Sequence, residues 1–275
     1  MNSKEYVFEK VSDNTIEVYR KEKVKDYRAQ ISDYIEEGII TYGADFILIT
    51  IDNTEVGYFC LGNQKEYANK ILEFFVINEY KCHAPQIIRE IIKHFECDGW
   101  FVNTQDSFSL SLLIELDLPY TINGFIFKYG RCVLPVLDNE TNSLLEVARV
   151  EEVERIYELV VLDDFYTGGD IESLREKIRN KELYVLKTSG RIIGVGFISI
   201  LKRTPRYADV AMLIVPEERK KGFGVLIQKM LIGLCEEYNL IPTACCDVDN
   251  IISRKTLQHA GYYLDGCMLI ADCNR

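Results

Sequence analysis

The sequence lacks any apolar run long enough to cross a membrane. No stretch approaches the roughly 18 uninterrupted apolar residues that a transmembrane helix needs. The first residues, Met1 to Glu5, are polar, and no apolar signal segment follows them. These two absences predict a cytoplasmic protein that is not exported and has no membrane partner.

The sequence also has little histidine and no clustered cysteine. Three histidines are present, and none of the nine cysteines forms a Cys-x-x-Cys pair. A structural zinc site needs ligands at short spacing, so we expect no metal. An odd number of scattered cysteines is typical of reduced cytosolic thiols. The adjacent Cys245 and Cys246 could suggest an acyl-cysteine route, but small residues filling a core strand are the favoured interpretation.

Positive charge is in deficit, since 32 Lys and Arg oppose 43 Asp and Glu for a net charge of -11. Such a surface repels phosphate backbones, so we expect no nucleic-acid partner. It is compatible with a cationic substrate such as an amine. The 275 residues, 48% of them hydrophobic, suit two domains of ordinary size with substantial cores.

The C-terminal half follows a linker at Leu134–Ser143, which holds a proline and a polar cluster. Hydrophobic periodicity then alternates between strand and helix spacing. It predicts strands at 144–150, 183–187, 192–200, 207–215, 243–248 and 262–270, and helices at 151–163, 170–181, 222–238 and 250–260. We expect Asp170 to be a helix N-cap.

The N-terminal half repeats this order of elements. The patterns predict a helix at 24–37, a hairpin at 46–51 and 56–61, a strand at 71–77, a helix at 85–95, a strand at 100–103 and a helix at 107–116. The same order twice indicates two copies of one fold. We therefore expect an N-terminal domain at residues 1–137 and a C-terminal domain at 143–275.

The most informative segment joins a strand to an amphipathic helix. It reads Val215-Pro-Glu-Glu-Arg219-Lys220-Lys221-Gly222-Phe223-Gly224. Glycines let a backbone approach a ligand closely, and free amides at a helix start bind anions. Three cations in an acidic chain add to this attraction. The segment predicts a pyrophosphate cradle, and it has neither the Walker A ending nor the third glycine of a dinucleotide fold, which leaves coenzyme A.

This Arg219-x-x-Gly222-x-Gly224 segment resembles the acyl-CoA loop of the GNAT superfamily of N-acyltransferases. A second motif agrees with it, since Asn250-Ile-Ile-Ser253 starts a helix that ends in Ala260-Gly261-Tyr262. The resemblance implies an α/β fold with a mixed central sheet flanked by helices, in two tandem GNAT-like domains. It also implies that the C-terminal sheet splays between 207–215 and 243–248. It implies an acyltransferase that uses acetyl-CoA as co-substrate and moves acyl groups other than amino-acyl.

The resemblance also implies which residues hold the acyl carrier. Backbone amides from Lys220 to Gly224, with Phe223 between the two glycines, would bind the pyrophosphate, and Arg219 and Lys221 would add positive charge. The backbone of Ile214 and Val215 would pair with the pantetheine arm like an added strand. Asn250 would hydrogen-bond the arm or the thioester region, with Ser253 beside it.

Acyl transfer to an amine requires the neutral amine. At pH 7 only about one lysine-like amine in a few thousand is neutral, which costs roughly 4.6 kcal/mol, and a positioned base offsets part of that. By position and charge Asp209 matches the glutamate that often serves as the general base in this family, and its shorter side chain would act through a water. Asp247 and Asp249, at the end of the next strand, are other candidates. In this family a tyrosine often acts as the general acid that protonates the leaving thiolate. Leu257 stands at its position here, so the general acid stays unassigned.

The corresponding loop of the N-terminal half differs. It reads Ile77-Asn-Glu-Tyr-Lys-Cys-His-Ala84-Pro85-Gln86, with both glycines replaced and one amide donor removed by the proline. We expect this half to be a degenerate copy that is inactive toward CoA and that caps the active half or shapes its substrate pocket.

The sequence thus predicts an N-acetyltransferase acting on the primary amine of a small molecule or an amino-acid-like acceptor. Two alternatives stay open: a non-catalytic acyl-CoA-binding regulatory module, which Leu257 favours, and transfer of a longer acyl or an aminoacyl group. The acceptor-pocket region would include Tyr157, Phe165 and Tyr166, for which core packing is the alternative. A homodimer is compatible with the sequence, which does not define the oligomeric state.

Overall fold

The protein divides into two compact units. The computed structural model describes residues 5–25, 35–36, 39, 42–130, 144–162 and 170–274. The N-terminal unit comprises Met1–Phe125 and Gly266–Arg275, and the C-terminal unit comprises Ile126–Asp265. The expected linker at Leu134–Ser143 and the aromatic residues Phe165 and Tyr166 lie outside the described residues. No helix in the described part of the chain is long and apolar enough to cross a membrane.

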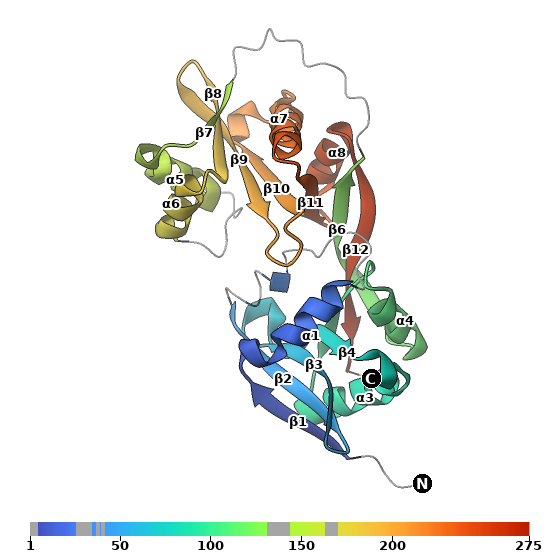
Figure 1. Cartoon of the computed structure of the whole chain (residues 1–275). Coiled ribbons are helices and arrows are strands. Elements are labelled where there is room, and N and C mark those ends of the chain that lie inside the picture. Colours follow the sequence, from blue (N-terminus) through green and yellow to red (C-terminus); the bar gives the residue numbers. More distant parts are fainter. Residues whose placement is uncertain are drawn as a thin grey trace. The chain divides into compact units, whose positions relative to one another are not determined.

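The C-terminal unit is built on a mixed sheet. Its antiparallel strands are β7 (Leu144–Val147), β8 (Leu183–Thr188), β9 (Arg191–Ile200) and β10 (Tyr207–Ile214), and β11 (Ile241–Asp247) runs parallel to β10. The helices are α5 (Val153–Leu162), α6 (Ile171–Arg179), α7 (Phe223–Glu237) and α8 (Ile251–His259) (Figure 1). Short 3-10 turns, η3 (Val150–Glu152) and η4 (Pro216–Glu218), precede α5 and α7.

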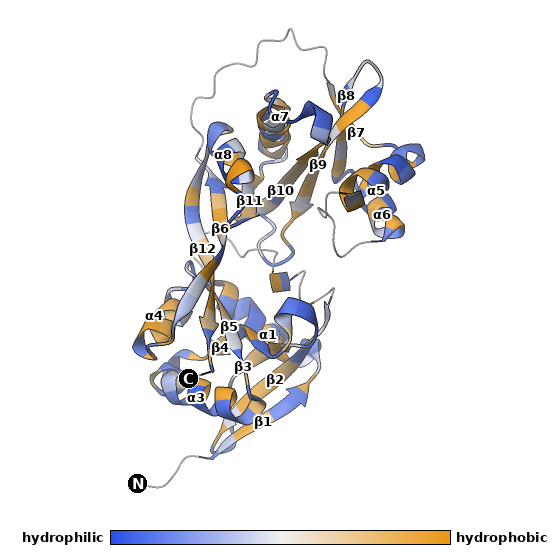
Figure 2. Ribbon diagram, turned by 180° about the vertical axis from the view of Figure 1, so that it is seen from behind, coloured by the Kyte–Doolittle hydropathy of each residue, from blue (hydrophilic) through white to orange (hydrophobic). Residues whose placement is uncertain are grey.

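Alternating strand side chains bury both faces of this sheet. Val210 and Ile214 of β10 pack with Ile227 and Leu231 of α7, whereas Leu213 belongs to the cluster formed with α5 and α6. This follows from the two-residue period of a strand. Burial of each such aliphatic side chain stabilises the fold by about 1.5–3 kcal/mol. The helices α5 and α6 show both orange and blue in Figure 2, as one-sided burial requires.

The N-terminal unit has the same order of strand pairing. Strands β1 (Tyr6–Val11), β2 (Ala44–Ile51), β3 (Thr54–Gly62) and β4 (Lys70–Val76) are antiparallel, and β5 (Gly99–Asn103) is parallel to β4. Its helices are α1 (Asp13–Lys25), α3 (Ala84–Phe95) and α4 (Ser107–Glu115), with 3-10 turns η1 (Lys65–Tyr67) and η2 (Asn78–His83). The repeated order confirms the prediction of two copies of one α/β fold.

Two strands contribute residues to both units. Strand β6 (Tyr120–Tyr129) passes from the N-terminal unit to the C-terminal unit at Phe125–Ile126, and β12 (Tyr262–Asp272) passes back at Asp265–Gly266. Residues Met268–Asp272 of β12 pair antiparallel with Asn103–Gly99 of β5. The last residues of the chain therefore complete the sheet of the N-terminal unit.

The C-terminal elements were predicted well, and the N-terminal ones less well. Each predicted strand and helix of the C-terminal half is present, with ends shifted by a few residues, and Asp170 caps α6 by accepting a hydrogen bond from the Ser173 amide at 2.9 Å. In the N-terminal half α1 (Asp13–Lys25) was not predicted, and residues 26–34 and 37 of the helix expected at 24–37 lie outside the described residues. Strands β1 and β6 were not predicted.

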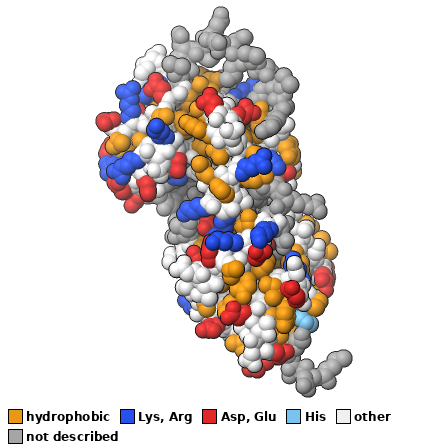
Figure 3. Space-filling model, viewed as in Figure 1, with side chains coloured by type: hydrophobic (Ala, Val, Ile, Leu, Met, Phe, Trp, Pro, Cys, Tyr) orange, Lys and Arg blue, Asp and Glu red, His pale blue; other side chains and the backbone are white. Residues whose placement is uncertain are grey.

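Helix α1 escaped prediction because it buries charged residues. Its buried side chains are Ile16, Arg20 and Lys23, so the apolar stripe that marks most helices is interrupted. Acidic and basic side chains are also interspersed over the face of the molecule shown in Figure 3.

Candidate functional site

The junction between β10 and α7 forms an open turn. Lys220 (φ 63°) and Gly222 (φ 87°) both adopt left-handed backbone conformations, and α7 begins directly after Gly222. No side chain caps this helix start. A Cβ built on Gly222 would meet no atom within 4 Å, so the turn is open at that residue. Uncapped amides at an open helix start are suited to binding an anion.

Gly224 has a different local role. A Cβ at this position would lie 3.2 Å from Thr256 Cγ2 and 3.3 Å from Met212 Cε. The missing side chain lets α7 approach both α8 and β10 closely. Gly222 is therefore exposed at the turn, whereas Gly224, like Phe223 beside it, is partly buried, and Gly224 packs against α8 and β10.

The basic residues of the loop are partly engaged within it. Arg219 Nε donates to the carbonyl oxygen of Ile214 at 2.9 Å, the strand end that we expected to meet the pantetheine arm. Lys221 Nζ lies 2.8 Å from Glu218 Oε2, and Arg191 holds the other carboxylate oxygen at 2.6 Å. The Lys221 hydrogen bond lowers the pKa of Glu218. Arg219 thus closes the turn, while Glu218 offsets part of the loop's charge.

Strands β10 and β11 diverge as predicted. They pair over three positions only, from Tyr207↔Ile241 to Asp209↔Thr243. Thr243 Oγ1 adds a hydrogen bond to the Ala208 carbonyl at 3.1 Å. Beyond Asp209, β10 pairs only with β9 as far as Ile214. Its other edge is therefore available to an extended ligand, which could add hydrogen bonds as a strand would.

Asn250 and Ser253 lie together at the start of α8. Asn250 Oδ1 accepts a hydrogen bond from the Ser253 amide at 3.0 Å, which makes Asn250 the N-cap. A ligand contact could therefore use the Nδ2 donor or the second lone pair of Oδ1. Val215 directly follows the end of β10, and its amide donates to the carbonyl oxygen of Ile193 at 3.0 Å.

The two candidate bases do not lie together. Asp209 is half-buried and level with Thr243, whereas Asp247 is exposed at the far end of β11, four residues beyond Thr243. At about 3.3 Å per strand residue this places Asp247 roughly 13 Å further along the sheet. The two carboxylates therefore cannot act on one proton, and Asp209 lies at the base of the divergence between β10 and β11.

Two nearby residues bear on the missing general acid. Leu257 is 2% exposed and packs in the interior. Tyr262 is also buried, and its hydroxyl has no hydrogen-bond partner among the described residues. Burial raises the pKa of Tyr262 well above its ordinary value. Neither residue offers an accessible proton to a leaving thiolate.

The N-terminal unit repeats the strand divergence but fills it. Strands β4 and β5 pair only at Lys70↔Gly99 and Ile71↔Trp100. Beyond them, Lys23 Nζ donates to the Phe74 carbonyl at 3.0 Å and to Asp106 Oδ2 at 2.7 Å. A side chain of α1 therefore occupies the strand edge that stays open in the C-terminal unit.

Sequence reasoning missed this buried charged cluster. Asp106 and Ser109 repeat the Asn250-x-x-Ser253 spacing, since Asp106 Oδ1 accepts from the Ser109 amide at 3.0 Å. This repeated spacing is the feature of the sequence that could have identified Asp106. Lys23 gave none, because α1 itself was not recognised. Among the described residues no three His, Cys, Asp or Glu side chains converge as a metal site would require.

Comparison with known families agrees with this geometry. A family model described as "Acetyltransferase (GNAT) domain" matches residues 12–130, and one described as "Acetyltransferase (GNAT) family" matches residues 144–262. The two matches together cover most of the chain. No curated protein sequence matches it.

Solved structures share the fold over the whole chain. A GNAT-family acetyltransferase from Colwellia psychrerythraea is 14% identical with a TM-score of 0.85, covering 97% of this chain and 99% of its own. A GCN5-related N-acetyltransferase from Sphaerobacter thermophilus is 9% identical with a TM-score of 0.65, covering 97% and 94%. A tandem GNAT protein from the clavulanic acid biosynthesis pathway is 12% identical with a TM-score of 0.63, covering 99% of each chain.

The fold and the two family matches define an acyltransferase of the α/β class. The chain belongs to the GNAT superfamily as a tandem GNAT protein, and it is a GNAT-type acetyltransferase. This confirms the family, the fold class and the type of enzyme predicted from the loop and the second motif.

Proposed function

We propose that the C-terminal unit transfers the acetyl group of acetyl-CoA to the primary amine of a small molecule or an amino-acid-like acceptor. The observation that carries the proposal is the uncapped helix start at Gly222 beside the unpaired edge of β10. The helix start would hold the diphosphate through backbone amides. The β10 edge would align the pantetheine arm, bringing the thioester toward Asp209.

The reaction replaces one acyl bond by another. The neutral amine nitrogen attacks the thioester carbonyl carbon, the carbon–sulfur bond breaks, and CoA leaves as a thiolate that takes up a proton. Asp209 would accept the amine's proton through a water, which favours the neutral amine. With Leu257 buried, the proton for the thiolate would come from solvent. The net charge of -11 favours a cationic acceptor approaching from water.

The first test measures binding of acetyl-CoA by calorimetry to the wild type and to Gly222→Glu. A carboxylate at the open turn would repel the diphosphate, so we expect at least about a tenfold loss of affinity. Gly43→Glu is the matched control, because Gly43 is also left-handed (φ 75°) and has only Asn63 Nδ2 within 4 Å of its Cβ position. Wild-type affinity in Gly222→Glu would sink the proposal.

The second test follows release of free CoA thiol with a panel of small amines and amino acids. Turnover with a primary amine supports acetyl transfer. The buried Leu257 favours one rival, a regulatory module that binds acyl-CoA without turnover. Binding with no thiol release across the panel would favour that rival. Competition between acetyl-CoA and longer acyl-CoA donors would show whether the acyl group is larger than acetyl.

A further inference from the structure

The N-terminal unit contains a small cleft at the divergence of β4 and β5. Its polar lining includes Lys23, Glu73, Asn103, Asp106 and Ser109, and its volume is about 30 Å³. Aromatic walls come from Phe74 and Trp100, whose rings meet edge to face at 6.1 Å between centroids. Every lining residue belongs to the N-terminal unit. The cleft is therefore separate from the acetyl-CoA site proposed above, and the inference below does not depend on that proposal.

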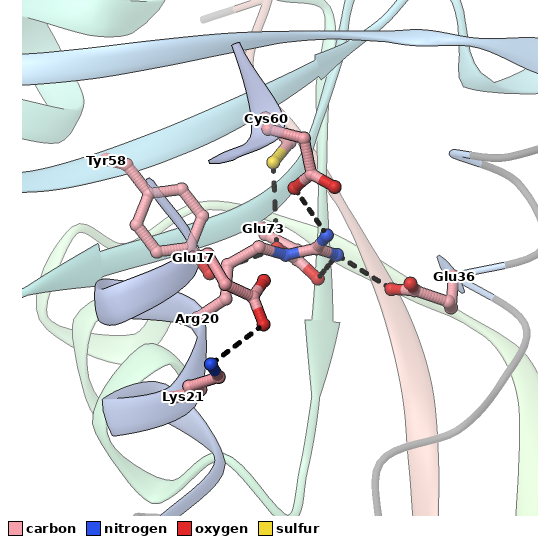
Figure 4. Close-up of polar contacts among 8 residues, drawn as sticks. Glu17, Arg20, Lys21, Glu36, Tyr58, Cys60 and Glu73 are labelled. Atoms are coloured by element: carbon pink, nitrogen blue, oxygen red, sulfur yellow. Dashed lines mark hydrogen bonds and ion pairs between the residues drawn. The ribbon is translucent and has the colours of Figure 1, made fainter. Parts of the chain in front are cut away.

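The charge of Glu73 is neutralised within the protein. Arg20 of α1 donates to both of its carboxylate oxygens, from Nε at 2.9 Å and from Nη2 at 2.8 Å (Figure 4). Tyr58 adds a hydrogen bond at 3.0 Å, and Glu36 contacts the same guanidinium at 2.7 Å. Burial alone disfavours the charge of Arg20, but Glu73 outweighs it and raises the pKa of Arg20. Glu73 is therefore held in place and does not attract a free cation strongly.

Asp106 is neutralised in the same way by Lys23. The two side chains are 7% and 10% exposed and 2.7 Å apart. Asp106 Oδ2 also accepts from Ser109 Oγ at 2.7 Å, while Oδ1 accepts from the Ser109 amide alone. A carboxylate oxygen can accept a further hydrogen bond. Asp106 Oδ1 can therefore accept one more hydrogen bond, although the charge of the carboxylate is already paired with Lys23.

Asn103 supplies a donor that the protein leaves unused. The residue is 7% exposed and lines the cleft. Its Oδ1 accepts from the Gln105 amide at 2.9 Å, which sets the orientation of the side-chain amide. Its Nδ2 makes no hydrogen bond with any residue that the structure describes. Because Asn103 lines the cleft, this donor is available to a partner from outside the protein.

The geometry points to a neutral ligand group that both donates and accepts hydrogen bonds. We propose that this cleft binds the carboxamide or hydroxyl end of a small uncharged molecule, which accepts from Asn103 Nδ2 and donates to Asp106 Oδ1. An anion would face Glu73 and Asp106, and a cation would face Lys23. The volume suits a group of two or three heavy atoms, about the space of two waters.

The chain contains a single tryptophan, Trp100, which lines this cleft, so the tryptophan emission comes from one known position. We would titrate the full chain with acetamide, ethylene glycol, acetate and methylammonium at constant ionic strength. The expected result is a saturable change in Trp100 emission at millimolar concentration with acetamide or ethylene glycol, and no such change with the two ions. Comparing the two neutral probes separates an amide ligand from a hydroxyl ligand.

Asn103→Leu removes the donor at nearly constant volume and should weaken the response at least tenfold. Asn63→Leu, at an exposed position of the same unit, should leave it unchanged. If Asn103→Leu does not fold, the wild-type protein still decides, because the Asn103 side-chain amide resonances should shift on addition of acetamide. An equal response to the ions overturns the proposal. So does an unchanged Asn103 resonance, or no saturable response, which would mean that water alone fills the cleft.

Discussion

Asp106 and Asn250 hold the same structural position in the two copies of the fold. Each caps the helix that follows the parallel strand, and each accepts a hydrogen bond from the amide three residues later, at 3.0 Å in both cases. Asp106 is buried and bound by Lys23, whereas Asn250 is exposed. One copy therefore occupies with its own lysine the strand edge that the other leaves available to a ligand.

The Lys23–Asp106 pair should be a major contributor to the stability of the N-terminal unit. Lys23→Met leaves the Asp106 carboxylate buried without its partner, which typically costs about 3–5 kcal/mol. We expect a matching fall in the free energy of unfolding in urea, followed by Trp100 fluorescence. Lys21→Met is the control, because Lys21 is 71% exposed and pairs only weakly with Glu17 at 3.6 Å. Equal effects of the two substitutions would contradict this account.

The same pair predicts a loss of stability in acid. Burial alone would raise the pKa of Asp106, but the Lys23 ammonium and the Ser109 hydrogen bonds outweigh it and hold that pKa below its ordinary value. A depressed folded-state pKa contributes stability that is present above the unfolded value and is lost as pH falls through the folded value. Unfolding free energy should therefore drop below about pH 4. In Asp106→Asn the drop should be smaller, and an unchanged profile would contradict the pairing.

The sequence predicted the C-terminal unit because its elements follow simple physical patterns. Helix α7 buries Ile227 and Leu231 one turn apart, and β10 alternates between two apolar clusters. The loop at Gly222 was visible because left-handed backbone and close approach require glycine. These are local signals, and they identify an element without knowledge of its neighbours.

The N-terminal unit was harder to predict because its stability depends on partners distant in sequence. Lys23 and Asp106 are separated by 83 positions, and Arg20 and Glu73 by 53. In a sequence, cations such as Arg20 and Lys23 of α1 indicate a helix face exposed to solvent. Their burial can be recognised only when the carboxylates that pair with them are known. The different roles of Gly222 and Gly224 were equally hidden, since they depend on how Thr256 and Met212 pack against Gly224.

The two loop glycines should respond differently to alanine. Gly222→Ala meets no steric contact but forces a left-handed conformation on a residue with a Cβ, which costs about 1–2 kcal/mol. Gly224→Ala has helical backbone, so the favourable helix propensity of alanine is offset by crowding against Thr256.

Thr256→Ser removes the crowding methyl and keeps a hydroxyl for the Oγ1 bond to the Ile252 carbonyl. Thermal unfolding should show that Thr256→Ser rescues Gly224→Ala by about 1 kcal/mol and does not rescue Gly222→Ala. Rescue of both would mean that the two glycines share one role.

Asp209 and Asp247 can be separated by their effect on the rate of thiol release. Asp209 lies where β10 and β11 begin to diverge, and Asp247 lies roughly 13 Å further along the sheet. If Asp209 takes the proton of the attacking amine, Asp209→Asn should lower kcat by about 100-fold or more and leave the affinity for acetyl-CoA unchanged. The rate of this variant should rise with pH, because a larger fraction of the amine is then neutral without a base.

Asp247→Asn serves as the matched control and should change kcat by less than about threefold, since an exposed carboxylate so far away cannot reach the same proton. The reverse order of effects would assign the base to Asp247 and would place the reacting thioester at the open end of the strands.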